Sequence, residues 1–296
     1  MDTVDQMWRG IDRRTFLIGA GATGLLAACG GGDPTTTPDR LAPRFSDGFR
    51  APATAVTGHG PQRFPFIVVA QDGLPMLTGS APSSIDIEVL RNGETITTQT
   101  VGARGLGQFT PFYPLEFEPP EAGSYVARTE FSELNNEFLV VEREDSSVFQ
   151  VGEPLPAFDT PTFDDGHGVN PVCTRPGEPC PFHEITLTEA LSNGRPTALL
   201  IATPEFCRTD VCGPSVEFLI EHGAGRDDIN IIHQEVFANF QVDAEAGDEP
   251  GLAPLLEAWD VFFEPSMFVT DADGIIRGAK HFTFDNDEVA ELLSLI

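Results

Sequence analysis

Two cysteines stand where a buried strand is expected to turn into a helix. Residues 198–202 form an apolar run of strand length, and the polar turn behind them holds Cys207 and Cys212. Gly213 and Pro214 then lead into apolar residues at helical spacing. The first N–H groups of a helix lack partners, so a thiolate at Cys212 would be stabilised there. This pattern permits thiol–disulfide exchange. A structural disulfide and two unreactive loop cysteines are the alternatives.

The composition is that of folded domains with a strongly acidic surface. The chain has 296 residues, enough for two ordinary domains and a leader, and 41% of them are hydrophobic. The net charge is −29, from 17 basic and 46 acidic residues. This charge argues against nucleic acid and anionic lipid surfaces as partners. Lys280 is the only lysine, and an acidic, lysine-poor surface fits either a salt-rich environment or a biased genome composition.

The first 29 residues have the features of an export signal. Arg13 and Arg14 precede the short apolar stretch 18–28, which is too short and glycine-rich for a membrane span. The arginine pair resembles the twin-arginine signal, which implies export of a folded chain. Residues 26–29, Leu-Ala-Ala-Cys, resemble a bacterial lipobox. That resemblance implies cleavage before Cys29, lipidation of its sulfur and a tether to the outer face of the membrane.

The next two segments are predicted as a linker and an all-β domain. Residues 30–59 are rich in Gly, Thr and Pro without an apolar period, which indicates a flexible tether. Residues 60–145 hold short alternating strands, and Asn92-Gly93 is a hairpin-turn signal. The segment 121–127 resembles the tyrosine corner of immunoglobulin-like domains, with Tyr125 as its tyrosine. Ala127 replaces the usual cysteine, so the resemblance implies a sandwich without that cross-link, here a spacer or partner-binding domain.

Residues 150–296 are predicted to form an α/β domain. A capping box at residues 186–189 starts a helix, followed by the buried strand and helix described above. Two further strands, at residues 229–237 and 266–269, flank a helix at 252–259. A tight turn at 271–274 leads into a hairpin strand, and Asp285 or Asn286 caps a final helix. This order predicts a mixed sheet flanked by helices.

This second domain resembles the thioredoxin-like superfamily. Cys212-Gly213-Pro214 is similar to the start of the family's Cys-Gly-Pro-Cys motif, and residues 152–158 resemble the opening of the peroxiredoxin and membrane-anchored thiol-disulfide branches. Glu264-Pro265 stands where the family places a cis-proline that faces its cysteines. The resemblance implies that Pro265 has a cis peptide bond, lies near the cysteine turn and shapes a substrate groove.

The motif departs from the family at its second cysteine. Ser215 occupies that place, and Cys207, five residues before Cys212, is the available substitute. Asp210-Val211-Cys212 is also similar to the copper-binding branch, which has a distant histidine ligand, here His233 or His281. The cysteine spacing is one residue longer than in that branch. Peroxidase chemistry would use a threonine three residues before the attacking cysteine, and Thr209 holds that place.

The cysteine count indicates a second pair. The chain has five cysteines, and lipidation of Cys29 would leave four, an even number for an oxidising compartment. Cys173 and Cys180 lie in one loop bent by prolines, so we expect a structural disulfide that contributes roughly 2–3 kcal/mol. A metal site with Cys173, Cys180 and His183 is the alternative, although the sequence offers no clear fourth ligand. We therefore expect no metal or other cofactor, and we interpret His233 as a structural histidine.

Together these patterns predict a membrane-tethered, extracytoplasmic lipoprotein. An immunoglobulin-like sandwich precedes a thioredoxin-like domain that exchanges disulfides with protein thiols outside the cytoplasm. Cys212 attacks as the thiolate, Cys207 resolves the mixed disulfide and Pro265 shapes the groove. The alternative is a non-catalytic module that binds a partner or copper, in which Cys207 and Cys212 form a structural disulfide.

Overall fold

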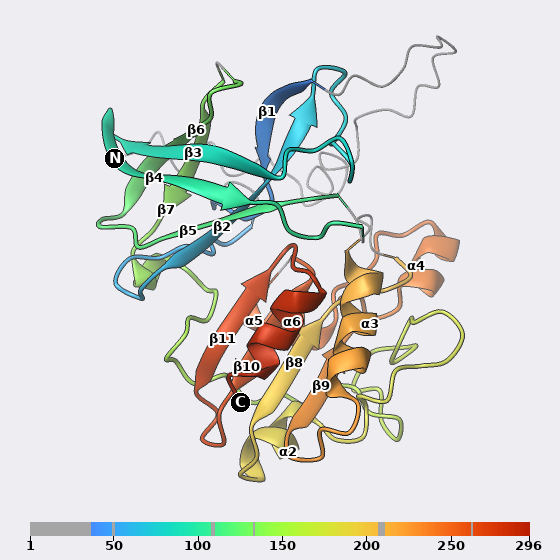
Figure 1. The fold of residues 1–296 in the computed structure, drawn as a ribbon. Helices are drawn as coiled ribbons and strands as arrows, with labels where there is room; N and C mark the ends of the chain where they lie inside the picture. Colours follow the sequence, from blue (N-terminus) through green and yellow to red (C-terminus); the bar gives the residue numbers. More distant parts are fainter. Residues whose placement is uncertain (1–36, 49–50, 108–109, 133, 207–210, 262) are drawn as a thin grey trace, which may run out of the picture.

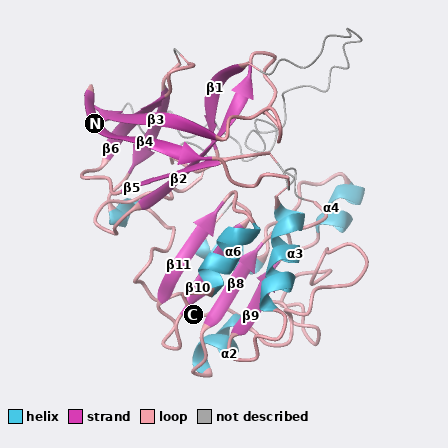
Figure 2. Cartoon of the chain, in the orientation of Figure 1, coloured by secondary structure: helices cyan, strands magenta, loops and turns pink. Residues whose placement is uncertain are grey.

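The computed structural model describes residues 37–48, 51–107, 110–132, 134–206, 211–261 and 263–296. The leader residues Arg13, Arg14 and Cys29 lie outside this part of the chain, as does Cys207. The described chain forms an all-β half followed by a half that combines strands and helices (Figures 1 and 2). The short helix η2 (Arg143–Asp145) stands between the two halves in the chain.

The all-β half consists of two antiparallel sheets. Their strand orders are β1-β2-β5 and β4-β3-β6-β7. The strand bounds are β1 Pro38–Pro43, β2 Gln62–Ala70, β3 Ser84–Arg91, β4 Glu94–Gly102, β5 Tyr113–Phe117, β6 Gly123–Arg128 and β7 Asn136–Val140. The predicted hairpin is confirmed, because Asn92 and Gly93 both have positive φ between β3 and β4. All-β structure was therefore predicted correctly over residues 60–145.

The expected tether is partly wrong. Residues 38–43 form strand β1, which pairs with β2 and buries Leu41 in the core of the all-β half. The core also contains Tyr125, whose hydroxyl donates to the carbonyl oxygen of Glu121 at 2.6 Å. That bond has the geometry of a tyrosine corner. The immunoglobulin-like assignment itself stays a prediction.

The second half has a mixed four-stranded sheet in the order β11-β10-β8-β9. Strand β8 is parallel to β9 and antiparallel to β10, which is antiparallel to β11. The strands are β8 Thr197–Ile201, β9 Asn230–Gln234, β10 Ser266–Thr270 and β11 Ile276–His281, and the helices are α2 Leu187–Ser192, α3 Cys212–Gly223, α4 Phe240–Ala246, α5 Pro254–Trp259 and α6 Asn286–Leu293. The predicted mixed sheet is confirmed.

Strand β8 is buried on both sides, because helices cover both faces of this sheet. Ala198 and Leu200 pack with residues of α3 and α6, which lie side by side (Figure 1). The alternate residues Leu199 and Ile201 pack with residues of α2 and α5 on the opposite face. The predicted caps of α2 and α6 are confirmed, since Thr186 and Asp285 each form a capping box. The described helices include none with the length and apolarity of a membrane span.

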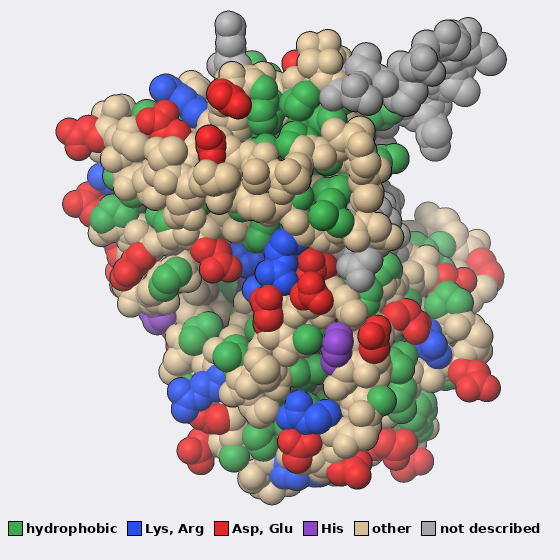
Figure 3. Space-filling model, viewed as in Figure 1, with side chains coloured by type: hydrophobic (Ala, Val, Ile, Leu, Met, Phe, Trp, Pro, Cys, Tyr) green, Lys and Arg blue, Asp and Glu red, His purple; other side chains and the backbone are tan. Residues whose placement is uncertain are grey.

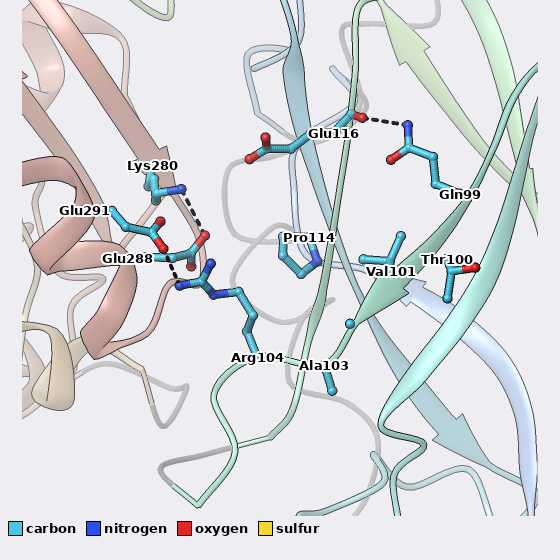
Figure 4. Close-up of a pocket in the computed structure, with 11 residues that line it drawn as sticks. Gln99, Thr100, Val101, Ala103, Arg104, Pro114, Glu116, Lys280, Glu288 and Glu291 are labelled. Atoms are coloured by element: carbon cyan, nitrogen blue, oxygen red, sulfur yellow. Dashed lines mark hydrogen bonds and ion pairs between the residues drawn. The ribbon is translucent and has the colours of Figure 1, made fainter. Parts of the chain in front are cut away.

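The two halves meet at the start of α6. Ile67, Val69 and Phe112 of the all-β half belong to the apolar cluster that includes α3 and α6. Beside it, charged side chains from both halves gather at the junction (Figure 3). An open pocket of about 500 Å³ lies there, lined by β4 on one side and by Lys280 and α6 on the other (Figure 4).

Glu288 is the centre of this charge cluster. It is 1% exposed, receives two hydrogen bonds from Arg63 at 2.9 and 3.1 Å, and accepts from Lys280 at 3.0 Å. Arg104 reaches across the same junction to Asp285 and Glu291. A chain with few cations therefore places three of them where its halves join.

We predict that Arg63→Gln destabilises the protein by about 3 kcal/mol, because it removes a principal partner of a buried carboxylate. Arg277→Gln is the matched control: Arg277 is 53% exposed in its pair with Asp271, and its loss should cost under about 1 kcal/mol. Equilibrium urea unfolding measures both. Equal effects of the two variants would contradict the importance of the junction.

Candidate functional site

The first candidate site is the start of α3. The helix begins at Cys212, as the sequence predicts, and Cys212 is disulfide-bonded. Ser215, which occupies the place of the family's second cysteine, is also buried and donates its hydroxyl to the Cys212 carbonyl at 2.7 Å. A sulfur at this position lies against the unpaired N–H groups of the helix. The helix start favours a thiolate at this position, whereas burial among apolar side chains opposes one.

The side chain of Cys212 is completely buried. Its relative exposure is 0%, and it belongs to the apolar cluster between the sheet and α3, together with Val216 and Met267. The sequence placed it correctly at the helix start but could not show that its side chain is enclosed. In this conformation a protein substrate cannot reach Cys212.

Pro265 has the predicted cis peptide bond to Glu264. It immediately precedes β10, where Ser266 is paired with Ile201 at the end of β8. A carboxylate oxygen of Glu264 accepts a hydrogen bond from the backbone N–H of Thr203 at 2.6 Å. Because Thr203 lies in the connection from β8 to α3, two residues after β8 ends, the cis-proline lies at the sheet end from which this connection leaves.

The second candidate site is a buried group of two cysteines and two histidines. Cys173, Cys180, His183 and His233 are all buried, and their ligand atoms lie within 4.8 Å of one another. The expected disulfide between Cys173 and Cys180 is not formed, because both are free thiols. Their mutual hydrogen bond lowers the pKa of Cys173 and raises the pKa of Cys180, so the pair readily holds one negative charge.

The loop before α2 and strand β9 bring these four residues together. The backbone N–H of His233 donates to the carbonyl oxygen of Phe182 at 3.1 Å, which aligns residues 182–183 beside β9. Next to Cys173, Thr174 donates its backbone N–H at 2.6 Å and its hydroxyl at 3.1 Å to the buried carboxylate of Glu235. The loop is thus fixed to β9 on both sides of Cys180.

His233 is buried in β9 with its Nε2 2.9 Å from the Ala202 carbonyl oxygen, as expected of a structural histidine. The sequence did not show that it also lies beside Cys173 and Cys180. His281, the other histidine considered as a copper ligand, is hydrogen-bonded to the Ser266 hydroxyl at 3.1 Å. Within the described residues, neither histidine therefore forms a ligand group with Cys212. The Cys-x2-His spacing of Cys180 and His183 was the available signal.

Comparison with protein-family models and with curated proteins gives no match. Solved structures that resemble the chain include Trxlp from Edwardsiella tarda EIB202 (16% identity, 36% of this chain and 88% of that chain, TM-score 0.26). A protein from Bacteroides thetaiotaomicron described as a putative protein disulfide isomerase matches at 14% identity, with a TM-score of 0.34. The match covers 50% of this chain and 89% of that chain. StoA from Bacillus subtilis matches at 18% identity, with a TM-score of 0.23. The match covers 34% of this chain and 83% of that chain.

These matches are to thioredoxin-like proteins and cover a third to a half of the chain. Their TM-scores lie below 0.5, so they carry no argument about activity. The chemistry of the chain is inferred from its own residues.

Glu264 gives the first site a measurable pH dependence. Burial raises the pKa of its carboxyl to about 8. The pKa of this carboxyl is higher in the folded chain than in the unfolded chain. Its contribution to the free energy of unfolding is therefore present at low pH and is lost as the pH rises from about 5 to about 8. The slope is at most about 1.4 kcal/mol per pH unit, less any solvent screening.

We predict that Glu264→Gln removes this loss, because the neutral amide has no proton to release and its oxygen can still accept from Thr203. Urea unfolding between pH 5 and pH 9 should show that the free energy of unfolding of the variant increases relative to that of the parent protein as the pH rises. Glu257→Gln, on the exposed side of α5, is the control and should follow the parent. A pH-independent difference for Glu264→Gln would contradict a raised carboxyl pKa.

Proposed function

We propose that the chain is an extracytoplasmic, membrane-tethered thiol–disulfide exchange protein with a thioredoxin-like second domain and an immunoglobulin-like first domain. One observation carries the exchange chemistry: a disulfide-bonded cysteine at the first position of α3, at the sheet end that holds the cis Glu264–Pro265 bond. The helix start favours release of Cys212 as a thiolate, against the opposing effect of its apolar surroundings.

We assign Cys207 as the partner of Cys212 and as the cysteine that meets the substrate. The complete burial of Cys212 supports this order, which reverses the one expected from the sequence. In the oxidising direction, a substrate thiolate attacks the Cys207 sulfur, and the Cys207–Cys212 bond breaks to release the Cys212 thiolate. The second substrate thiol, after losing its proton, attacks the substrate sulfur of the mixed disulfide; the bond to Cys207 breaks, the Cys207 thiolate leaves, and the substrate departs with a new disulfide. Two electrons pass to the Cys207/Cys212 pair, and the reverse steps reduce a substrate.

A trapping experiment separates the two roles. Cys212→Ser should accumulate mixed disulfides on Cys207, because the resolving thiol is gone, whereas Cys207→Ser should accumulate few. Non-reducing electrophoresis followed by mass spectrometry of the trapped species measures this. Preferential trapping in the Cys207→Ser variant would show that Cys212 is the attacking residue instead.

The second candidate function is a binding module in which the Cys212 disulfide is structural. The same burial favours it, because a fully enclosed disulfide is protected from reduction. The reduction potential of the pair separates the two functions. A value near or above the thioredoxin value of about −270 mV supports exchange, and a value far below it supports the structural bond.

Export and anchoring are tested at the leader. Replacement of Arg13 and Arg14 by lysine should stop export by the twin-arginine route. Cys29→Ala should abolish lipid labelling, because no other residue can supply the lipidated sulfur at the predicted cleavage site. Labelling with a radioactive fatty acid and fractionation of membranes measure both effects. Normal lipid labelling of Cys29→Ala would contradict the lipoprotein proposal.

A further inference from the structure

Cys173, Cys180, His183 and His233 have the chemistry of a closed metal site, and we propose that they bind one zinc ion. All four are enclosed, with relative exposures of 6% for Cys173 and 0% for the other three. Two thiolates and two imidazoles form a common ligand set for structural zinc. This site is separate from the disulfide at Cys212.

The distances between the ligand atoms match the edges of a tetrahedron around zinc. Metal–nitrogen and metal–sulfur bonds of the usual length require edges of about 3.3 Å between two nitrogens and about 3.6 Å between nitrogen and sulfur. The two imidazole nitrogens, Nδ1 of His233 and Nε2 of His183, are 3.3 Å apart. The nitrogen–sulfur distances are 3.3, 3.4 and 3.7 Å.

The outer nitrogens of both imidazoles fix which nitrogen faces the site. Nε2 of His233 lies 2.9 Å from the Ala202 carbonyl oxygen, and Nδ1 of His183 lies 3.2 Å from the Pro161 carbonyl oxygen. A carbonyl oxygen only accepts, so each of these nitrogens carries the proton. In the neutral imidazoles, the inner nitrogens then point lone pairs at each other. A cation between them removes this repulsion. Histidines that bind metals typically donate their other ring N–H to a group such as a backbone carbonyl oxygen.

Hydrogen bonds also position the cysteine side chains. The backbone N–H of Cys180 points at the sulfur of Cys173, with a distance of 3.4 Å. Thr174 is held by the buried carboxylate of Glu235, which restricts the position of the adjacent Cys173. Outer contacts of this kind orient metal-binding side chains before the metal arrives.

A metal cross-link also explains how the preceding segment stays ordered. Within residues 146–186 no helix or strand is formed, although roughly 40 residues is far beyond the usual length of an irregular connection. The segment nevertheless buries Leu155, Val169 and Phe182. Three of the four ligands lie in it and the fourth lies in β9, so one zinc ion would fasten the segment to the sheet.

Zinc also accounts for two neighbouring thiols that are not bonded to each other. This step rests on the export proposed above, because vicinal thiols in an oxidising compartment otherwise form a disulfide. Bound as thiolates to zinc, a metal without redox chemistry of its own, Cys173 and Cys180 are protected from oxidation. The complete enclosure leaves no open position for a substrate, so the ion has a structural role.

The test is metal analysis of the full chain, purified without chelators. We expect elemental mass spectrometry to find about one zinc ion per chain. Cys180→Ser and His233→Gln should each reduce the zinc content at least tenfold, since either change removes a ligand. Cys212→Ser and His281→Gln are the matched controls, and both should retain the zinc, because Cys212 and His281 lie outside the ligand group.

Because a ligand variant can also fail to fold, the parent protein supplies a second readout. Chelator-treated protein loaded with Co²⁺ under reducing conditions should show the visible absorption of a tetrahedral, thiolate-bound ion, and Zn²⁺ should abolish it by displacement. Zinc should also raise the thermal midpoint of the chelator-treated chain.

Three results would overturn the proposal. They are a Cys173–Cys180 disulfide in the freshly isolated protein, zinc content unchanged in Cys180→Ser, and stoichiometric copper bound in preference to zinc. None of these depends on exchange at Cys207 and Cys212, so the two proposals fail separately.

Discussion

The buried carboxylate of Glu288 is the interaction on which the arrangement of the two halves depends. It caps the first turn of α6 and is held by Arg63 from the all-β half and by Lys280 from β11. A net charge of −29 makes cations scarce, and an unpaired carboxylate at a nearly closed junction would be costly. The position of α6, and through it the packing of α3, is therefore coupled to the all-β half. The all-β half is therefore part of the packing that holds the second half in place.

Most of the fold could be predicted because its elements carry strong local signals. Strand β8 is a continuous apolar run, and the caps of α2 and α6 were read from their residues. Two elements had no such signal. Helix α4 buries none of its residues, so it shows no apolar period, and β1 buries only Leu41 within a proline-flanked stretch. Both are stabilised by contacts that the local sequence does not contain.

The sites were harder to predict, because burial and side-chain direction depend on the tertiary structure. The sequence placed Cys212 at the helix start and Pro265 before its strand, and both placements are confirmed. It could not show that Cys212 is enclosed. It also paired Cys173 with Cys180 because they are close in sequence. His233, 53 residues beyond Cys180, is brought to them only by the pairing of residues 182–183 with β9.

The two cysteine centres have opposite physical requirements, and the chain meets them in different ways. The proposed exchange site needs a sulfur that a substrate can reach and a thiolate that leaves easily, and the leaving cysteine is placed at the start of α3. The proposed zinc site needs thiolates that nothing can reach, and Cys173 and Cys180 are both buried in a loop packed on β9. Thr174 links the two centres, because its hydroxyl contacts Glu235 on one side and the backbone N–H of Glu205 on the other. Since Glu205 lies in the connection that leads to Cys212, a loop fastened by zinc would also hold one wall of the exchange site in place.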